Sequence, residues 1–240
     1  MKIQFLGTSF GAPTQERHQQ SVLIETNNGN AYIFDAGAPV LDLLVRNGYD
    51  LTKIKAVFIS HLHGDHLNGL FDLINLSEYF GMQFTVYMPE QSGIELLKTY
   101  MKTVNSTLKS HCKLISLGEF YNADNFSVSS YVTDHLELSN GKSYGFMCRA
   151  DDANVYITGD MHPSLKDFPS VLVNEKTDLI VTECAHFTAD ALCERLNKCN
   201  TERVAFIHVM PVGKYDDLLS LKDRFNFVSI FPNDDDEIII

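Results

Sequence analysis

Short apolar runs recur along the chain and alternate with stretches of helical periodicity. The runs are five to seven residues long and rich in Val, Ile, Tyr and Phe, which predicts strands. They cover residues 2–6, 21–25, 31–35, 56–60, 84–88, 126–132, 143–149, 154–158, 178–183 and 203–208, and the closing EIII predicts one more. Apolar residues at helical spacing predict helices over 38–47, 67–80, 91–108 and 189–198.

The order of these elements is typical of a layered α/β chain. Strands come first and then alternate with helices, and this order occurs twice. We expect two sheets with outer helices in a single domain over residues 1–240, because 240 residues form one large core and are too few for two comfortable domains. The acidic run 234–237 is interpreted as a solvated turn before the last strand.

Polar side chains follow several of the predicted strands at the point where each strand ends. In layered α/β folds, functional sites collect where strands end and loops begin. The sequence therefore predicts one functional edge, to which five strands contribute Asp35, His61, Asp160, Glu183 and His208.

The densest group of such residues is the segment HLHGDH, which follows the strand at 56–60. It contains His61, His63, Asp65 and His66 within six positions. Imidazole nitrogen and carboxylate oxygen are preferred ligands of zinc and similar divalent metals. A polar solvated loop is the alternative, but four ligand-type residues in six favour a metal site.

The pattern HxHxDH after a strand, with FDAG before it and isolated His, Asp and His residues after it, resembles the metallo-β-lactamase superfamily over nearly the whole chain. The resemblance implies a four-layer αββα sandwich and two divalent metal ions, with zinc expected and manganese or iron as alternatives. It also implies a ligand set: His61, His63 and His135 for one ion, Asp65, His66 and His208 for the other, Asp160 bridging them, and Asp35 supporting the site without ligating.

Within the superfamily, two stretches resemble the ribonuclease Z branch. They are the glycine-rich N-terminal segment FLGTSFGAPTQERHQQSVLIE, for which a flexible hairpin is the alternative, and SYGFMCR after His135. Members that handle oxygen with iron usually carry Glu at the position of His63, so the histidine here favours hydrolysis.

The segment TECAHFTADAL resembles the part of the ribonuclease Z branch that assists the leaving group. The resemblance implies that His186 donates a proton and that Glu183 orients it, because an alkoxide leaves poorly unless it is protonated. A carboxylate partner would also raise the pKa of the histidine. The alternative is that Thr188 is a helix N-cap and His186 is only a polar neighbour.

The net charge and a missing segment restrict the class of substrate that we expect. The net charge of −12 argues against a polyanionic partner, and the tRNA-clamping arm of bacterial ribonuclease Z has no counterpart in the sequence, so tRNA is an unlikely substrate. A small anionic substrate remains compatible, because metals supply positive charge locally. His162, His18 and Lys214 are candidates to contact it, a solvated side chain being the alternative for Lys214, and His111 is assigned no role.

The cysteines and the apolar runs bear on the compartment in which we expect the protein. Five cysteines at irregular spacing without a CxxC pair favour reduced thiols in a cytoplasmic protein over a disulfide framework. No signal peptide or membrane span is expected, and a homodimer is compatible with the resemblance.

Together these features predict a dinuclear metal-dependent hydrolase. The favoured activity is a phosphodiesterase that acts on a small phosphodiester of the cyclic nucleotide or cyclic phosphate type. Attack by a metal-bridging hydroxide is implied, with Asp65, His186 and Glu183 as catalytic residues. The first alternative is a hydrolase of a lactone, thioester or sulfate ester, and the second is a metal-binding sensor or scaffold without turnover.

Overall fold

The structure is a computed structural model that describes residues 1–107, 111–210 and 213–240. The chain forms two compact units, each built around a seven-stranded sheet. Unit 1 contains residues 1–115 and 233–239, and unit 2 contains residues 116–232 and 240. The expectation of a single domain over residues 1–240 stays a prediction.

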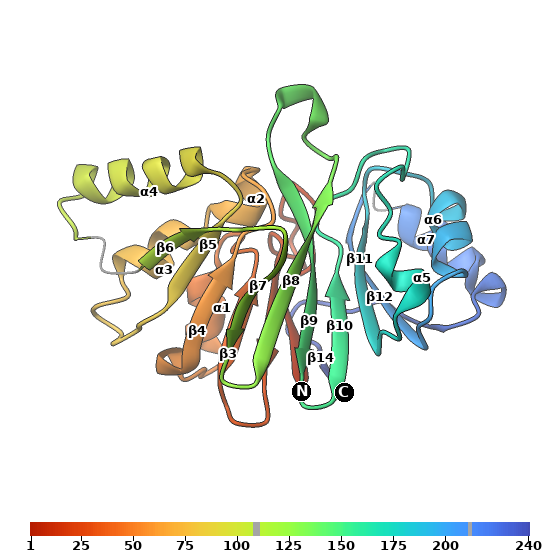
Figure 1. Cartoon of the computed structure of the whole chain (residues 1–240), viewed down its shortest axis with the longest axis horizontal. Coiled ribbons are helices and arrows are strands. Elements are labelled where there is room, and N and C mark those ends of the chain that lie inside the picture. Colours follow the sequence, from red (N-terminus) through yellow and green to blue (C-terminus); the bar gives the residue numbers. More distant parts are fainter. Residues whose placement is uncertain (108–110, 211–212) are drawn as a thin grey trace. The chain divides into compact units, whose positions relative to one another are not determined.

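The sheet of unit 1 has the strand order β14-β1-β2-β3-β4-β5-β6, of which Figure 1 labels β14 and β3 to β6. Strands β14, β1, β2 and β3 pair antiparallel, whereas β3, β4, β5 and β6 run parallel. The strands are β1 (Lys2–Gly7), β2 (Ser21–Glu25), β3 (Ala31–Phe34), β4 (Ile54–Phe58), β5 (Thr85–Met88), β6 (His111–Leu114) and β14 (Glu237–Ile239).

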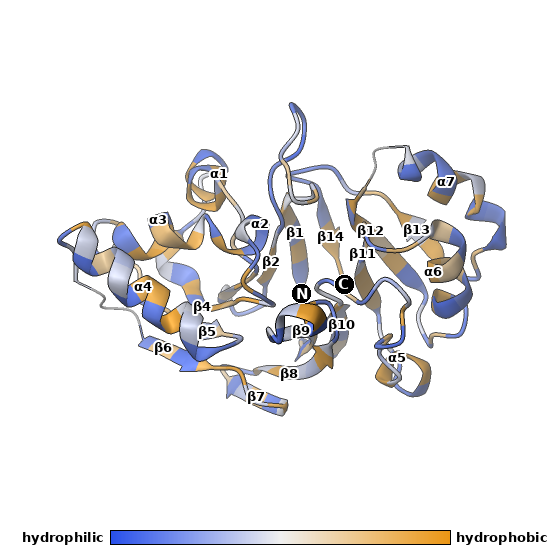
Figure 2. Cartoon of the chain, turned by 90° about the horizontal axis from the view of Figure 1, so that it is seen from above, coloured by the Kyte–Doolittle hydropathy of each residue, from blue (hydrophilic) through white to orange (hydrophobic). Residues whose placement is uncertain are grey.

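One face of this sheet packs against helices. Alternate residues of the strands, such as Ile33 and Val57, join a core cluster with apolar side chains of the helices, such as Leu44 and Leu97. Figure 2 colours these helices in alternating hydrophobic and hydrophilic bands, as expected for amphipathic helices. They are α1 (Val40–Arg46), α2 (Gly64–Leu67), α3 (Leu70–Asn75) and α4 (Gln91–Thr103), with a 3₁₀ turn η1 (Leu51–Lys53).

The sheet of unit 2 has the order β13-β12-β11-β10-β9-β8-β7. Strands β7 to β10 pair antiparallel, and β10 to β13 run parallel. The strands are β7 (Gly118–Ala123), β8 (Phe126–Thr133), β9 (Ser143–Ala150), β10 (Ala153–Ile157), β11 (Leu179–Cys184), β12 (Arg203–Val209) and β13 (Val228–Ile230).

The helices of unit 2 bury their apolar faces in a second core cluster. Tyr156, Ile180 and Phe206 from the strands contact this cluster together with Leu192 and Leu218 from the helices. The helices are α5 (Val171–Asn174), α6 (Ala189–Leu196) and α7 (Lys214–Ser220), with 3₁₀ turns η2 (Glu137–Ser139) and η3 (Lys222–Arg224).

All eleven predicted strands are present, and the strands that were missed within the described residues, β6, β7 and β13, lie at sheet edges. Edge strands carry exposed polar residues, so the alternation that reveals a strand is weak in them. The predicted helix over 67–80 divides into the end of α2 and α3, and the predicted helix over 91–108 ends at Thr103, residue 108 lying outside the described residues.

The division of the 67–80 helix has a local cause at Gly69. Its N–H donates to the carbonyl of Ala36 at 2.8 Å instead of continuing the helical ladder. A Cβ at this position would lie 2.6 Å from the carbonyl oxygen of Gly37, so only glycine permits the approach. The break therefore fastens the FDAG segment to the chain that follows the HLHGDH loop.

The acidic run 234–237 is only partly the predicted solvated turn. The side chain of Asp234 is 8% exposed, and its carboxylate accepts hydrogen bonds from the backbone N–H and the hydroxyl of Thr8. Asp234 thus anchors the loop after β1, which the sequence pattern does not reveal.

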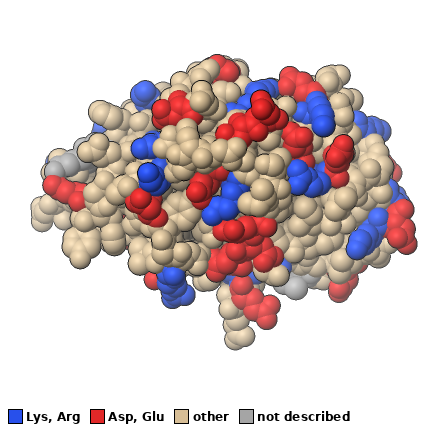
Figure 3. Space-filling model, turned by 90° about the horizontal axis from the view of Figure 1, so that it is seen from below, with Lys and Arg blue, Asp and Glu red and all other residues tan. Residues whose placement is uncertain are grey.

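The charge distribution and the helix lengths complete the description. On the face drawn in Figure 3, acidic and basic side chains of the described residues are interspersed. Among the described residues, no helix has both the length and the apolar character needed to cross a membrane.

Candidate functional site

In unit 1, the candidate residues lie where β3 and β4 end. These strands are parallel, with Phe34 opposite Phe58, so Asp35 and the loop that begins after β4 reach the same edge of the sheet. The loop places the rings of His61 and His66 with centroids 4.2 Å apart, and those of His61 and His63 4.6 Å apart. Four candidate ligands of the HLHGDH segment therefore cluster within unit 1.

Asp35 organises this cluster. Its carboxylate is 2% exposed and accepts three hydrogen bonds, from the Ser60 backbone N–H at 2.7 Å, the Ser60 hydroxyl at 2.9 Å and His66 Nδ1 at 2.7 Å. A bond from Nδ1–H to a carboxylate sets the tautomer that leaves the Nε2 lone pair for a metal. The predicted supporting role of Asp35 fits this geometry.

Ser60 is a residue that the sequence interpretation missed. Its hydroxyl donates to Asp35 and lies 3.0 Å from Nδ1 of His61. Ser60 therefore links the Asp35 carboxylate, which orients His66, to the ring of His61. Its position directly before HLHGDH, at the end of a predicted strand, was the feature of the sequence that could have indicated this role.

The donor atoms of unit 1 suit a divalent metal. Two ligands at zinc distances of ~2.0–2.1 Å around a tetrahedral ion stand about 3.3–3.4 Å apart. Nε2 of His66 lies 3.3 Å from Oδ2 of Asp65. The two side chains assigned to the same ion by the family resemblance thus have the spacing that such an ion requires.

Close backbone packing holds the FDAG segment against the loop. The N–H of Ala36 donates to the carbonyl of His66 at 2.8 Å. A Cβ on Gly37 would lie 2.3 Å from the carbonyl oxygen of Asp65, so a larger residue would displace this loop. The glycine of FDAG is therefore a condition for the position of Asp65.

In unit 2, three parallel strands bring candidate ligands to one edge. Strands β10, β11 and β12 lie in register, and Asp160, Glu183 and His208 stand at or just beyond their carboxyl ends. Ligand atoms of these three residues lie within 4.8 Å of one another.

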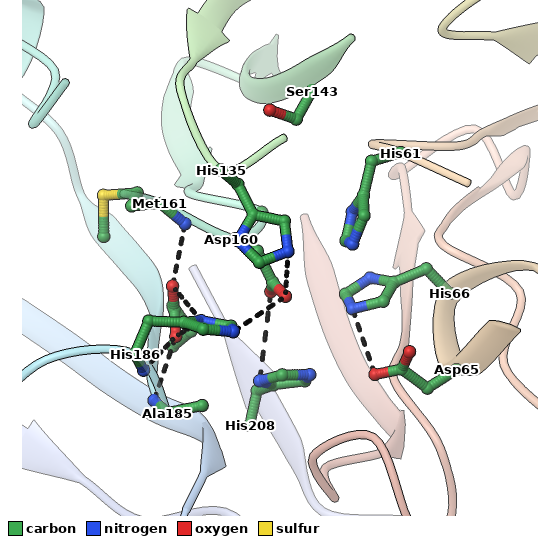
Figure 4. A network of polar contacts seen from close by, with 12 residues as sticks. His61, Asp65, His66, His135, Ser143, Asp160, Met161, Ala185, His186 and His208 are labelled. Carbon is green, nitrogen blue, oxygen red and sulfur yellow. Dashed lines mark hydrogen bonds and ion pairs between the residues drawn. The ribbon is translucent and has the colours of Figure 1, made fainter. Parts of the chain in front are cut away.

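His135 joins this group from the loop after β8. Its Nε2 lies 3.6 Å from Oδ2 of Asp160, and Nδ1 of His208 lies 3.9 Å from Oδ1 of the same carboxylate (Figure 4). Asp160 is 3% exposed and receives a histidine at each oxygen, an arrangement suited to a carboxylate that ligates through both atoms. Unit 2 thus has its own candidate metal ligands beside those of unit 1.

Glu183 and His186 form a hydrogen-bonded pair beside Asp160. Oε2 of Glu183 lies 2.8 Å from Nδ1 of His186 and accepts the backbone N–H of Ala185 at 2.9 Å, while Oε1 accepts the N–H of Met161 at 2.8 Å. The ring directs Nε2 to within 3.9 Å of Oδ2 of Asp160, as Figure 4 shows. The buried carboxylate therefore fixes the ring with one nitrogen facing the candidate metal ligands.

Thr188 has the helix-capping role considered as the alternative. Its side chain accepts the N–H of Ala191 at 3.2 Å at the start of α6. The cap and the Glu183–His186 pair coexist, so capping by Thr188 does not argue against a function for His186.

Lys214 contacts the loop that carries His186. Its Nζ donates to the carbonyls of Ala185 at 2.9 Å and Phe187 at 2.8 Å, one on each side of the histidine. The side chain thus braces this loop, an arrangement that neither the predicted substrate contact nor the solvated alternative included. Residues 211–212, between His208 and Lys214, lie outside the described residues.

The other candidate contacts have partners within their own units. Nδ1 of His18 lies 2.8 Å from Oδ2 of Asp234. Nδ1 of His162 lies 2.8 Å from the hydroxyl of Ser164, and its Nε2 lies 3.6 Å from Glu137. Substrate contact by His18, His162 or Lys214 stays a prediction, as do the assigned roles of the metal ligands.

The cysteines are thiols, as the sequence predicts, and all five are free. Burial raises the pKa of Cys184, which follows Glu183 directly, to about 12, and that of Cys199 also to about 12. Cys148 is fully buried, and burial raises its pKa well above 9.0. Raised pKa values favour inert structural thiols over nucleophiles.

Known proteins resemble the chain over most of its length. The family model for the Anti-Pycsar protein Apyc1 matches residues 1–218. Ribonuclease Z of Shouchella clausii is 28% identical over 159 residues, which cover 63% of this chain and 49% of the relative, so the chain spans about half the length of such curated relatives.

Solved structures show the same fold. The metallo-β-lactamase fold protein YhfI from Bacillus subtilis matches with a TM-score of 0.82 and 17% identity over 99% of each chain. The short form of human tRNase Z matches with a TM-score of 0.80 and 18% identity over 100% of this chain and 99% of that one. Zn²⁺-bound PqqB from Methylobacterium extorquens matches with a TM-score of 0.73 and 13% identity over 100% of both chains.

These matches confirm the predicted α/β class and the resemblance to the superfamily. The chain shares its two-sheet fold with the solved structures and its sequence similarity with the curated ribonuclease Z proteins. The chain belongs to the Anti-Pycsar protein Apyc1 family, in the ribonuclease Z-like branch of the metallo-β-lactamase superfamily.

Proposed function

We propose that the protein is a dinuclear metal-dependent phosphodiesterase that acts on a small phosphodiester of the cyclic nucleotide or cyclic phosphate type. In this proposal, the candidate ligands described above hold two divalent ions, with zinc expected. Family membership and the two sets of donor atoms support it. Such ions, when bound, supply positive charge for an anionic substrate and lower the pKa of a water molecule so that it can attack near neutral pH.

The observation that carries the proposal is the Glu183–His186 pair. Hydrolysis of a phosphodiester expels an alkoxide, which leaves poorly unless a proton reaches its oxygen. His186 is held through Nδ1 by the buried Glu183, and its Nε2 lies 3.9 Å from Asp160. A proton on Nε2 therefore faces the carboxylate around which a substrate phosphate would bind.

Asp65 has a second proposed role in the reaction. Besides its donor oxygen near His66, its carboxylate can accept a proton from the attacking water and orient it. The structure places this carboxylate at 11% exposure, so most of its surface faces protein.

Charge supports a small substrate over a large polyanion. The net charge is −12, and basic side chains are interspersed with acidic ones on the face in Figure 3. Nucleic-acid backbones bind to continuous groups of Lys and Arg. We therefore propose a small anionic substrate and disfavour tRNA as a partner.

The test is a substrate panel on full-length protein whose metal content has been measured. The panel contains cyclic mononucleotides, bis-p-nitrophenyl phosphate, a lactone, a thioester and a sulfate ester. Turnover of the lactone, thioester or sulfate ester alone would replace the proposal with the first alternative. Bound metal without any turnover would replace it with a sensor or scaffold.

The variant His186→Ala tests the proton donor. Its kcat on a cyclic nucleotide should fall by about 10²–10⁴-fold. The loss on bis-p-nitrophenyl phosphate should be much smaller, because p-nitrophenolate is a stable anion that leaves without a proton. His111→Ala is the matched control, since this exposed histidine of β6 lies at the start of its strand in unit 1 and has no assigned role. Equal losses on both substrates would contradict the assignment.

A further inference from the structure

Two loops of unit 2 carry candidate metal ligands and are joined by one carboxylate. Residues 134–139 follow β8 and include His135, and residues 160–168 follow β10 and include Asp160. Oδ2 of Asp167 accepts the backbone N–H of Asp134 at 2.7 Å and the backbone N–H of His162 at 2.9 Å. One oxygen therefore ties the residue before His135 to the residue two positions after Asp160.

The path of the second loop places Asp167 at this junction. Leu165 adopts a left-handed backbone conformation, with φ of 54°, although its side chain is 2% exposed and carries a Cβ. Its N–H donates to the carbonyl of His162 at 2.8 Å, and its own carbonyl accepts the N–H of Phe168 at 3.3 Å. This conformation is unfavourable for leucine, so the surrounding contacts must maintain it. The reversal at Leu165 returns the chain so that Asp167 reaches the N–H of His162.

A second link between the two loops consists of solvent-exposed ion pairs. Nζ of Lys166 forms an ion pair with Glu137 and lies 3.5 Å from Oδ2 of Asp134. These side chains are 39% to 52% exposed, so water and salt screen the pairs and leave them weak. The Asp167 hydrogen bonds are therefore the stronger connection, and Lys166 provides a natural comparison.

We propose that Asp167 is a positioning residue that sets the separation of His135 and Asp160 and thereby the affinity of the protein for divalent metal. Nε2 of His135 lies 3.6 Å from Oδ2 of Asp160, within a few tenths of an ångström of the ~3.3–3.4 Å between two ligands of a tetrahedral zinc ion. Because Asp167 bonds to backbone N–H groups and not to a ligand side chain, it acts through the position of both loops. The inference rests on the metal-binding part of the proposed function and is independent of the substrate.

The experiment measures zinc affinity of full-length protein stripped of metal with EDTA and dialysed. Zinc is titrated in competition with a chromophoric chelator, for wild type, Asp167→Ala, Asp167→Asn and the control Lys166→Ala. We expect Asp167→Ala to weaken zinc binding by about 10–100-fold, the range found when groups that orient metal ligands are removed. Asp167→Asn retains a carbonyl oxygen that accepts both N–H groups, so it should remain within about threefold of wild type, as should Lys166→Ala.

Thermal unfolding of the metal-free proteins separates positioning from general stability. A residue that only stabilises the fold would lower the unfolding temperature and leave the zinc affinity of the folded protein within threefold of wild type, which would overturn the proposal. An Asp167→Asn variant as weak as Asp167→Ala would also overturn it. If Asp167→Ala does not fold, Asp167→Glu displaces the carboxylate by one methylene, and wild-type affinity in that variant would count against the proposal.

The outcomes distinguish this inference from the proposed function. Wild-type protein that binds zinc but hydrolyses no phosphodiester would refute the proposed activity and leave the role of Asp167 open to the same measurement. Wild-type activity with unchanged zinc affinity in Asp167→Ala would refute only the positioning role.

Discussion

Replacing Asp35 by alanine should destabilise unit 1 even without metal. The substitution leaves the buried N–H of Ser60 without this acceptor and removes the carboxylate that faces Nδ1 of His66. Each of these losses costs about 1–2 kcal/mol in a buried site. Asp35 also has φ of 58°, a left-handed conformation that aspartate tolerates and that costs alanine about 1 kcal/mol. The expected loss is therefore about 3–5 kcal/mol in the free energy of unfolding.

Urea and thermal unfolding in EDTA measure this loss without interference from metal. For a chain of this length, 1 kcal/mol shifts the unfolding midpoint by roughly 2–4 °C, so a decrease on the order of 10 °C is expected. Asp35→Asn tolerates the same backbone conformation and retains one acceptor, so it should lose about half as much. The control is Asp42→Ala, which removes an exposed ion pair with Arg46 and should change stability by less than about 0.5 kcal/mol.

Zinc affinity provides the second measurement on the Asp35 variants. Because Asp35 sets the tautomer of His66, both variants should bind zinc about 10–100-fold more weakly than wild type. A loss below about 1 kcal/mol in metal-free Asp35→Ala would refute the reasoning. It would mean that Ser60 and His66 find other acceptors once the carboxylate is removed.

Two further predictions concern unit 2. Lys214→Met should lower kcat for a phosphodiester about 10–100-fold with little change in KM, because the loop that holds His186 loses two hydrogen bonds. Lys222→Met, at an exposed lysine, is the control. A variant with a raised KM and an unchanged kcat would instead support contact between Lys214 and the substrate. Burial raises the pKa of Cys184 from 9.0 to about 12, so this thiol contributes stability that is present below pH 9 and lost as pH rises toward 12. The free energy of unfolding should fall by at most about 1.4 kcal/mol per pH unit because of this thiol. Urea unfolding between pH 8 and 11 should show a weaker dependence of this free energy on pH in Cys184→Ala than in wild type. Equal pH dependence in the two proteins would contradict the prediction.

Hydrophobic pattern and motif spacing predicted most of the fold and the chemical character of the site. Strand periodicity is a local property, so the buried strands were identified, while β6, β7 and β13 were missed because edge strands carry polar residues. The division between α2 and α3 depends on a hydrogen bond from Gly69 to Ala36, which lies 33 positions earlier and leaves no trace in helical periodicity.

Ligand-type residues at the ends of strands were also predictable, because parallel strands in register bring their carboxyl ends to one edge. The positions of Asp35, His61, Asp160 and His208 in the structure follow from that rule. Their roles as metal ligands or support stay predictions until metal binding is measured.

The sequence by itself determined the α/β class, the metal-ligand character of HLHGDH and the pairing of Glu183 with a histidine three residues later. Only the tertiary structure decided the hydrogen-bond partners of Ser60, Lys214 and Asp167. Each forms hydrogen bonds whose partners are set by the path of a loop: Ser60 to Asp35, Lys214 to the carbonyls of Ala185 and Phe187, and Asp167 to the N–H groups of two separate loops. Residue type and spacing encode local periodicity and donor chemistry, whereas contacts between side chains and distant backbone groups exist only once the chain is folded.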